Sequence, residues 1–374
     1  MTNNLNTTLY KRNTNGSIQQ WSIIVEGDKF YTKEGLKDGK LTSSKATTVE
    51  GKNEGKKNET SANEQALKEA DSKWRKKLEE GYCDNINNID NKRETFEPML
   101  AEKYLDYKDK IIFPVLVSAK IDGHRMILKK DGLWTRNGKQ YFSCPHIFEM
   151  LKPIFIKHPD WVIDGEIYSH DENFETISSL VRKTKPTQED LEQSKKLVQY
   201  WIFDGVVDNK ELGFIDRFDL IKREVINTVG ENNKSFRFVE NEVVNSHELI
   251  ETFHTTLTSL GYEGVMIRII NSPYENKRSK FLLKYKHFLD EEFEIVGVEE
   301  GKGNRSEMAG NIVLRLKDGR TFCAGLVGGI EYYKELLKNK RLLIGKKATI
   351  RYQNLTEDGM PRFPVAVNID RWDV

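Results

Sequence analysis

The distribution of apolar and polar positions divides the chain into three regions. From residue 8 to residue 48, short apolar runs alternate with turn signals such as TNG, EGDK and KEG, which predicts a small meander of strands. Ser61 and Glu64 then form the S-x-x-E pattern that caps a helix. Four apolar residues are expected on one face of that helix: Leu67, Ala70, Trp74 and Leu78. The first region is therefore expected to end near residue 80.

From about residue 82 to residue 289, strand-like and helix-like runs follow one another. The strand-like runs are IIFPVLVSA, HRMILKK, WVIDGEIY, LVQYWIFDGVV, EGVMIRII and SKFLLKYK. The helix-like runs are FETISSLVRK, DRFDLIKREVINTVG and HELIETFHTTLTSL. This order suits two packed antiparallel sheets with flanking helices better than a regular βαβ repeat.

The third region, residues 290–374, consists mainly of predicted strands. It contains a KDGR hairpin turn, one helix near EYYKELLKN and a final strand at KKATIRYQNL. Such a segment is typical of a small Greek-key barrel of the OB type, a fold that often binds nucleic acid. The pattern therefore predicts an α+β multidomain protein with units at residues 1–80, 82–289 and 290–374. Three units also suit a length of 374 residues, because single cores rarely grow beyond ~250 residues.

The charges balance overall, with 59 Lys and Arg residues against 58 Asp and Glu residues and a net charge of +1. A nucleic-acid partner would therefore have to meet a local basic face. Seven basic residues gather late in the first region: Lys52, Lys56, Lys57, Lys73, Arg75, Lys76 and Lys77. They are compatible with a solvated surface and with a DNA-binding surface, and the sequence leaves both open.

The cysteines and the apolar runs limit the class of protein further. Cys83, Cys144 and Cys323 are far apart and form no CxxC pair, so neither a zinc site nor a disulfide framework is indicated. The N-terminal residues lack the apolar core of a signal peptide, and no apolar run approaches the ~18 residues of a membrane span. We expect a cytosolic protein that does not bind a membrane.

The segment KIDGHR, from Lys120 to Arg125, places a nucleophile at the end of an apolar strand. A lysine amine attacks only when it is neutral, and its free pKa of ~10.4 keeps it charged at pH 7. Nearby positive charges would lower that pKa, and the candidates are Arg125, Lys284, Lys286 and a magnesium ion. Gly123 is expected to let a phosphate approach the backbone closely.

Five further segments follow in order: TRNG, IDGEIY, YWIFDG, EGVMIR and LLKYKHF. Arg136, beside a tight turn, can hold a phosphate or ribose oxygen. Glu166, in the middle of an apolar strand, needs a partner such as a ribose hydroxyl or a metal-bound water. Phe203 can stack on a purine, although a core phenylalanine explains its local pattern better.

The last two segments supply a carboxylate and two amines. Glu263, at the start of a strand, is a plausible ligand for a hard cation. Lys284 and Lys286 lie two positions apart on one strand and so face the same side of the sheet. Like charges side by side are unfavourable unless an anion lies between them, and a triphosphate would serve.

In this order the six segments resemble the motif set of the covalent nucleotidyltransferases, which are the DNA ligases, RNA ligases and mRNA capping enzymes. The resemblance covers roughly residues 98–374. FETISSLVR and the junction KYKHFLDEEFEIVG make it specific to the ATP-dependent DNA ligases. It implies an ATP-grasp-like adenylation domain over residues 82–289 and an OB-fold domain over residues 290–374. Residues 1–80 loosely resemble a WGR-type domain of DNA-repair proteins.

The resemblance implies a mechanism in which Lys120 is adenylated by ATP, passes AMP to the 5′-phosphate of a nick in duplex DNA, and the 3′-hydroxyl then displaces AMP. It implies a ribose contact for Glu166, an adenine contact for Phe203 and contacts to the nucleotide or DNA phosphate for Arg125 and Arg136. Further nucleotide contacts are implied for the following residues: Ser118, Ala119, Ile121, Arg217, Glu263, Lys284 and Lys286. Glu166 and Glu263 would bind Mg²⁺, with Mn²⁺ as a substitute. A monomer is expected because nick sealing needs one active site and the chain shows no coiled-coil pattern.

The chain departs from the family pattern at three places. Ser118 stands where many relatives have a larger polar residue, which leaves the recognition of the adenine edge open. The basic motif that orients pyrophosphate in some relatives has no clear counterpart at Arg362 or Arg371. The DNA-encircling helical domain of long relatives has no counterpart here, and residues 1–80 would replace it if they bind DNA.

Three other interpretations remain open. An RNA ligase or a capping guanylyltransferase would use the same lysine chemistry, and a capping enzyme would take its label from GTP. A NAD-dependent ligase is disfavoured because the cysteine-rich and helical tail modules of such enzymes are missing. A catalytically silent DNA-binding scaffold would gain nothing from Lys120, Glu166, Glu263 and Lys286.

Overall fold

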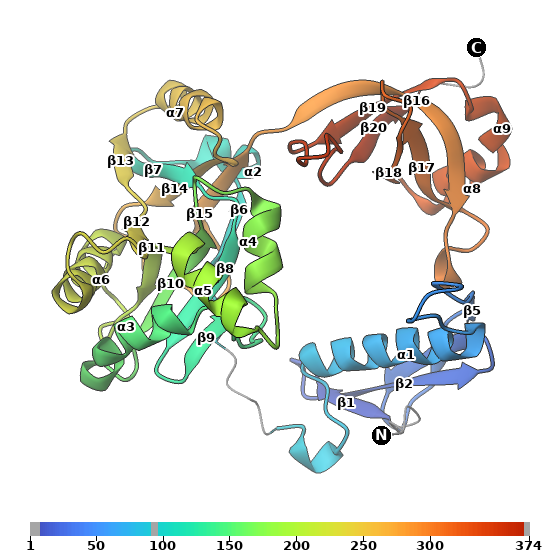
Figure 1. The fold of residues 1–374 in the computed structure, drawn as a ribbon, viewed down its shortest axis with the longest axis horizontal. Coiled ribbons are helices and arrows are strands. Elements are labelled where there is room, and N and C mark those ends of the chain that lie inside the picture. Colours follow the sequence, from blue (N-terminus) through green and yellow to red (C-terminus); the bar gives the residue numbers. More distant parts are fainter. Residues whose placement is uncertain (1–7, 91–95, 370–374) are drawn as a thin grey trace. The chain divides into compact units, whose positions relative to one another are not determined.

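The computed structural model describes residues 8–90 and 96–369 (Figure 1). The chain divides into two compact units, of which one holds residues 95–287 and the other holds the segments on either side of it. Arg371 lies outside the described residues. Within the described part, no helix is both long and apolar enough to cross a membrane.

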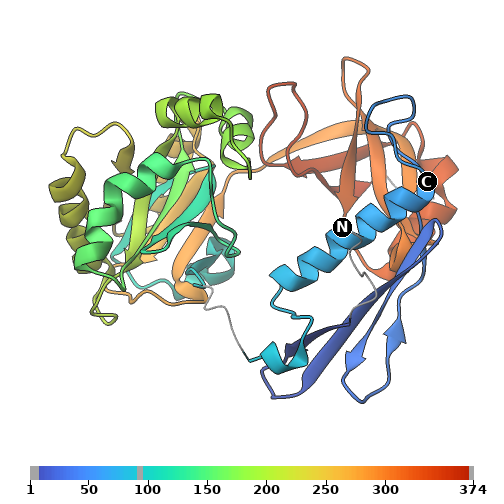
Figure 2. The ribbon, with the colours of Figure 1, turned by 60° about the horizontal axis from the view of Figure 1, so that its bottom comes forward.

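The N-terminal segment forms an antiparallel sheet with one long helix across it (Figure 2). The strands are β1 Leu9–Arg12, β2 Ile18–Glu26, β3 Lys29–Leu36, β4 Thr42–Ser43 and β5 Thr47–Thr48. The helix is α1 Ala62–Glu79, and a short turn η1 spans Ile86–Asn88. The predicted capping box is present, because Ser61 and Glu64 each accept a hydrogen bond from the backbone N–H of the other. Leu67, however, is 47% exposed, and Ala66 is buried in its place beside Ala70.

Two five-stranded sheets form the frame of residues 95–287. The first, called the β7 sheet, has the order β13-β7-β14-β15-β6. Its strands are β6 Leu100–Lys103, β7 Val115–Lys120, β13 Asn241–Val244, β14 Gly264–Ile269 and β15 Arg278–Lys286. The second, called the β10 sheet, has the order β12-β11-β10-β8-β9. Its strands are β8 His124–Lys129, β9 Gly132–Thr135, β10 Val162–Tyr168, β11 Gln199–Val206 and β12 Phe236–Phe238.

Each sheet is mainly antiparallel and contains one parallel pair, β15 with β6 and β11 with β12. Helices α3 Pro145–Lys157, α4 Phe174–Val181, α5 Gln188–Leu197 and α6 Phe214–Val229 belong to the half of the unit that holds the β10 sheet. Residues of α3, α4 and α6 share one apolar core with that sheet. Helices α2 Tyr104–Tyr107 and α7 His247–Ser259, with the turn η2 Lys108–Lys110, lie with the β7 sheet.

The C-terminal strands form a closed five-stranded barrel, as an OB fold requires. They are β16 Leu289–Glu300, β17 Ala309–Arg315, β18 Thr321–Leu326, β19 Lys347–Tyr352 and β20 Val365–Ile369. The turn η3 Gly303–Arg305 and the helices α8 Ile330–Lys338 and α9 Lys340–Leu343 complete the domain. The expected final strand is β19, and one more strand follows it. β20 closes the barrel by pairing with β18 and β19.

Candidate active site

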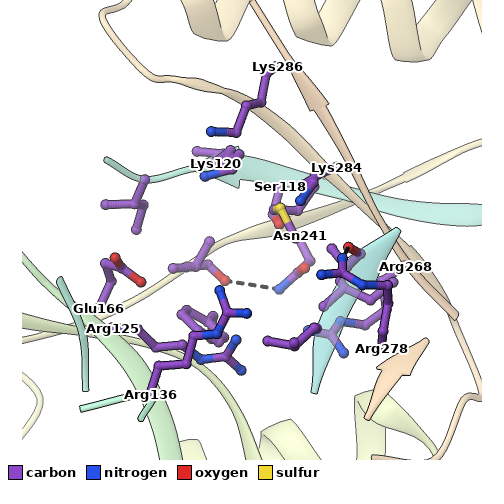
Figure 3. A pocket seen from close by; sticks show the side chains of 18 residues that line it. Ser118, Lys120, Arg125, Arg136, Glu166, Asn241, Arg268, Arg278, Lys284 and Lys286 are labelled. Carbon is purple, nitrogen blue, oxygen red and sulfur yellow. Dashed lines mark hydrogen bonds between the residues drawn. The ribbon is translucent and has the colours of Figure 1, made fainter. Parts of the chain in front are cut away.

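A pocket of about 280 Å³ lies between the two sheets of residues 95–287 (Figure 3). Ten of the residues predicted from the sequence line it: Ser118, Ala119, Lys120, Ile121, Arg125, Arg136, Glu166, Phe203, Lys284 and Lys286. Eight further lining residues were not predicted: Leu100, Ala101, Val239, Asn241, Met266, Arg268, Arg278 and Leu282. The motifs that are far apart in the sequence therefore meet at one cavity.

Lys120 is the last residue of β7, and its amine donates a hydrogen bond to the carboxylate of Glu263. The same carboxylate forms an ion pair with Lys286. Burial raises the pKa of the Glu263 carboxyl, but the Lys120 and Lys286 ammonium groups outweigh burial and hold that pKa below its usual value. The group in direct contact with Lys120 is thus the Glu263 carboxylate, whereas the sequence had suggested Asp122 as the carboxylate that orients the amine. Glu263 lies behind the two lysines and does not itself line the pocket.

Glu166 projects from β10 on the other side of the pocket (Figure 3). Burial, aided by the charges of Asp164 and Glu263, raises the pKa of Glu166 to about 8 against the opposing effect of Lys120 and Arg125. Gly123 packs against this strand, because a Cβ atom there would lie 2.2 Å from the Ile167 carbonyl oxygen. Strand packing therefore requires glycine at this position.

Arg125 lines the pocket and is held from behind by Asp164. Its Nε and Nη2 atoms donate to the two carboxylate oxygens of Asp164 at 2.9 and 2.5 Å. Asp164 also accepts a hydrogen bond of 2.6 Å from the Tyr274 hydroxyl. The Arg125 guanidinium lies 5.5 Å from the centre of the Phe203 ring, which fixes both side chains on one wall.

Arg217 does not reach the pocket, contrary to the sequence prediction. Its guanidinium is 2% exposed and donates to Asp204 and to the carbonyl oxygens of Leu212 and Ser272. Arg268 of β14, which donates to the same Asp204 at 2.6 Å, does line the pocket. Arg268 stands two positions after Met266 in the EGVMIR strand and shares its face, but the sequence did not mark that face as part of the site.

The pocket lining is strongly cationic. Burial, followed by the charges of Arg278, Lys286, Lys120 and Arg136, lowers the pKa of Lys284. Burial and the charges of Arg125 and Arg278 likewise lower the pKa of Arg136. Among the described residues that line the pocket, Glu166 is the one acidic side chain. Such a cavity is complementary to a polyanion such as a triphosphate.

Comparison with known proteins identifies the family. Residues 98–286 match the model of the ATP dependent DNA ligase domain, and residues 300–369 match the DNA ligase OB-like domain. A DNA ligase of African swine fever virus is 26% identical over 359 residues, covering 89% of this chain and 81% of its own length. A DNA ligase of Haemophilus influenzae is 29% identical over 264 residues, covering 69% of this chain and 87% of its own.

Solved structures agree on the fold. A Lig E DNA ligase structure has a TM-score of 0.60 at 24% identity and covers 74% of this chain and 99% of its own. The two matched domains correspond to the unit with the cationic pocket and to the closed barrel. The chain therefore belongs to the ATP-dependent DNA ligases.

Proposed function

We propose that this ligase seals nicks in duplex DNA and that Lys120 is the residue that becomes adenylated. The observation that carries the proposal is the position of the Lys120 amine, at the end of β7 and at the edge of a cationic pocket between two sheets. An amine fixed at the wall of a cationic cavity is placed for in-line attack on a phosphorus atom.

The proposed reaction has three phosphoryl transfers. The Lys120 amine attacks the α-phosphorus of ATP, so that a P–N bond forms while the bond to pyrophosphate breaks. The 5′-phosphate oxygen of the nick then attacks the same phosphorus and breaks the P–N bond. Finally the 3′-hydroxyl attacks the 5′-phosphate and releases AMP. Each transfer depends on positioning and charge neutralisation, which a wall of fixed cations can provide.

Within this proposal Glu263 holds the Lys120 and Lys286 amines in place before ATP binds. Lys284, Lys286 and Arg136 neutralise the phosphates, and Phe203 packs against the base. Glu166 lies across the pocket from Lys120, where a ribose hydroxyl can meet its carboxyl group.

A magnesium ion is part of the proposal, with Glu166 in the pocket as a protein ligand and Glu263 as a second one once ATP draws the Lys120 and Lys286 amines from its two oxygens. No group of three or more His, Cys, Asp or Glu side chains that could hold a metal is present in residues 8–90 and 96–369. Mg²⁺ does not need such a group, because it is commonly bound by one or two carboxylates together with substrate phosphates and water. The ion would supply additional positive charge at the phosphates.

We also propose that residues 1–80 contribute to nick binding and that the enzyme acts as a monomer. The basic residues there are partly paired, since Lys52, Arg75 and Lys77 form ion pairs with neighbouring acidic residues. Exposed basic side chains remain at Lys56, Lys57 and Lys76. Deletion of residues 1–80 is expected to weaken binding to a nicked duplex and to spare self-adenylation. Unchanged nick affinity would exclude this role.

The central experiment is a labelling assay with α-labelled ATP or GTP and magnesium. We expect a covalent label from ATP that is stable in alkali and released by acid, as a P–N bond requires, that Lys120→Ala lacks and that nicked duplex DNA discharges. Lys130→Ala is the matched control, because Lys130 is 60% exposed and does not line the pocket. A label that persists in Lys120→Ala would reject the assignment of the nucleophile.

A further inference from the structure

The side chain of Ser118 is short, so the pocket wall around it is formed mainly by the residues on the neighbouring strands. In the β7 sheet Ser118 is paired with Asn241 of β13 on one side and with Met266 of β14 on the other. Directly paired residues point to the same face of a sheet, so these three side chains form a row. All three line the pocket, and Figure 3 shows Asn241 close to Ser118.

The amide of Asn241 is fixed in one orientation. Its Nδ2 atom donates to the carbonyl oxygen of Val239 at 2.9 Å, the bond drawn in Figure 3. The Val239 N–H in turn donates to the Ile202 carbonyl of β11 at 2.9 Å, next to Phe203. Because a carbonyl oxygen only accepts hydrogen bonds, the NH₂ group must face Val239. The Oδ1 atom and the second N–H are then the groups that a ligand can meet.

We propose that Asn241 reads the purine base of ATP. Its Oδ1 atom accepts a hydrogen bond from the 6-amino group, and its second N–H donates to an adjacent ring nitrogen. An asparagine amide has this bidentate complementarity to adenine. Phe203 from β11 and Met266 from β14 approach the pocket from the two sheets and bracket the base between them. This inference rests on the proposed binding of ATP in this pocket.

The Val239 carbonyl makes this recognition selective against guanine. Guanine carries an oxygen acceptor at position 6, so an amide could match it only after a rotation that exchanges Oδ1 and Nδ2. That rotation would replace the bond to Val239 by two carbonyl oxygens facing each other. Selectivity for adenine therefore arises both from the favourable contact with Asn241 and from the repulsion that the rotated amide would meet at the Val239 carbonyl oxygen.

The test compares ATP with purine riboside triphosphate, which lacks the 6-amino group, as substrates for adenylation of the enzyme. Wild-type enzyme is expected to prefer ATP by about tenfold, as the loss of one buried hydrogen bond predicts. Asn241→Leu is expected to lower kcat/KM for ATP about a hundredfold, because two hydrogen bonds are lost, and the value for purine riboside triphosphate about tenfold, because only the bond to the ring nitrogen is lost. The ratio of the two values therefore falls toward one. Glu242→Gln, at the exposed neighbouring position of β13, is the control and keeps the wild-type ratio.

The ratio is measured within one preparation, so partial unfolding of a variant changes both rates equally and leaves the ratio intact. A wild-type ratio in Asn241→Leu would overturn the assignment, whether both rates fall together or neither changes. Wild-type enzyme that takes no label from ATP would instead reject the proposed adenylation itself, and the two failures are thus distinguishable.

Discussion

Asp204 is the residue whose replacement is expected to destabilise the adenylation unit most clearly. Its carboxylate is 1% exposed and accepts hydrogen bonds from Arg217 Nε at 2.7 Å and from Arg268 Nη1 at 2.6 Å. The two arginine side chains are 2% and 7% exposed. One buried carboxylate thus forms ion pairs with two buried guanidinium groups.

Asp204→Asn removes the negative charge and keeps the volume. Breaking a buried ion pair by removing one partner costs about 3–5 kcal/mol, because the remaining charge is left buried without its partner. The asparagine oxygen can still accept one hydrogen bond, so we expect about 3 kcal/mol. For a unit of this size each kcal/mol lowers Tm by roughly 2–4 °C, which gives a decrease of about 6–12 °C.

Differential scanning calorimetry of the full chain tests this expectation, and the transition of residues 95–287 is the one that a non-reactive ATP analogue raises. Asp208→Asn is the matched control, because the same substitution falls at a side chain that is 65% exposed. In Asp204→Asn/Arg268→Met one unpartnered guanidinium is removed, and part of the loss should be recovered. A change below about 1 °C for Asp204→Asn would refute the reasoning.

Three further predictions concern hydrogen bonding and protonation. Tyr274→Phe removes the hydroxyl bonded to Asp164 and should slow Lys120 labelling about threefold to tenfold with the fold retained, and an unchanged rate would contradict this. Burial lowers the pKa of His146 to about 4, so below pH ~6.5 the unfolded chain gains a proton that the folded chain does not. Because His146 is partly exposed, the effect is reduced: between pH 7 and 5 the free energy of unfolding in urea should fall by about 1 kcal/mol more in the wild-type protein than in His146→Gln. Equal losses in the two proteins would contradict this. A bound triphosphate should raise the lowered pKa of Lys284, so the amine should take up a proton when the nucleotide binds. Binding calorimetry with α,β-methylene ATP at alkaline pH, in two buffers of different ionisation enthalpy, should detect this proton uptake. Lys284→Met should reduce the number of protons taken up.

The sequence predicted the parts of the site that are encoded in strands. Lys120, Glu166 and Lys286 were found because each belongs to a short motif on a strand, where alternation determines which side chains share a face. Arg217 was misplaced because a helix start such as DRFDL does not show which partner the guanidinium will find. That partner, Asp204, lies on another element, and the local sequence gives no sign of the ion pair.

The residues that were missed depend on pairing between distant strands. Asn241 lies in a short run with no chemical signature, and only its pairing with Ser118 across more than a hundred positions brings it to the pocket. Leu67 was misassigned because the buried face of α1 is small. Ala66 and Ala70 are the residues of this helix that are fully buried. The last barrel strand, β20, was missed because it is short and follows a proline-containing segment that resembles a turn.

Asp164 of the IDGEIY motif and Asp204 of the YWIFDG motif are neighbours in the structure. Asp164 of β10 and Asp204 of β11 are directly paired in the ladder, and both side chains are almost completely buried. Two carboxylates in that arrangement repel each other unless cations surround them. Arg125, Arg217 and Arg268 supply those cations, and two of the three line the pocket. The ion pairs that offset the repulsion between the two carboxylates therefore also fix positive charge at the pocket wall before a nucleotide binds. Phosphoryl transfer depends on such preorganised charge.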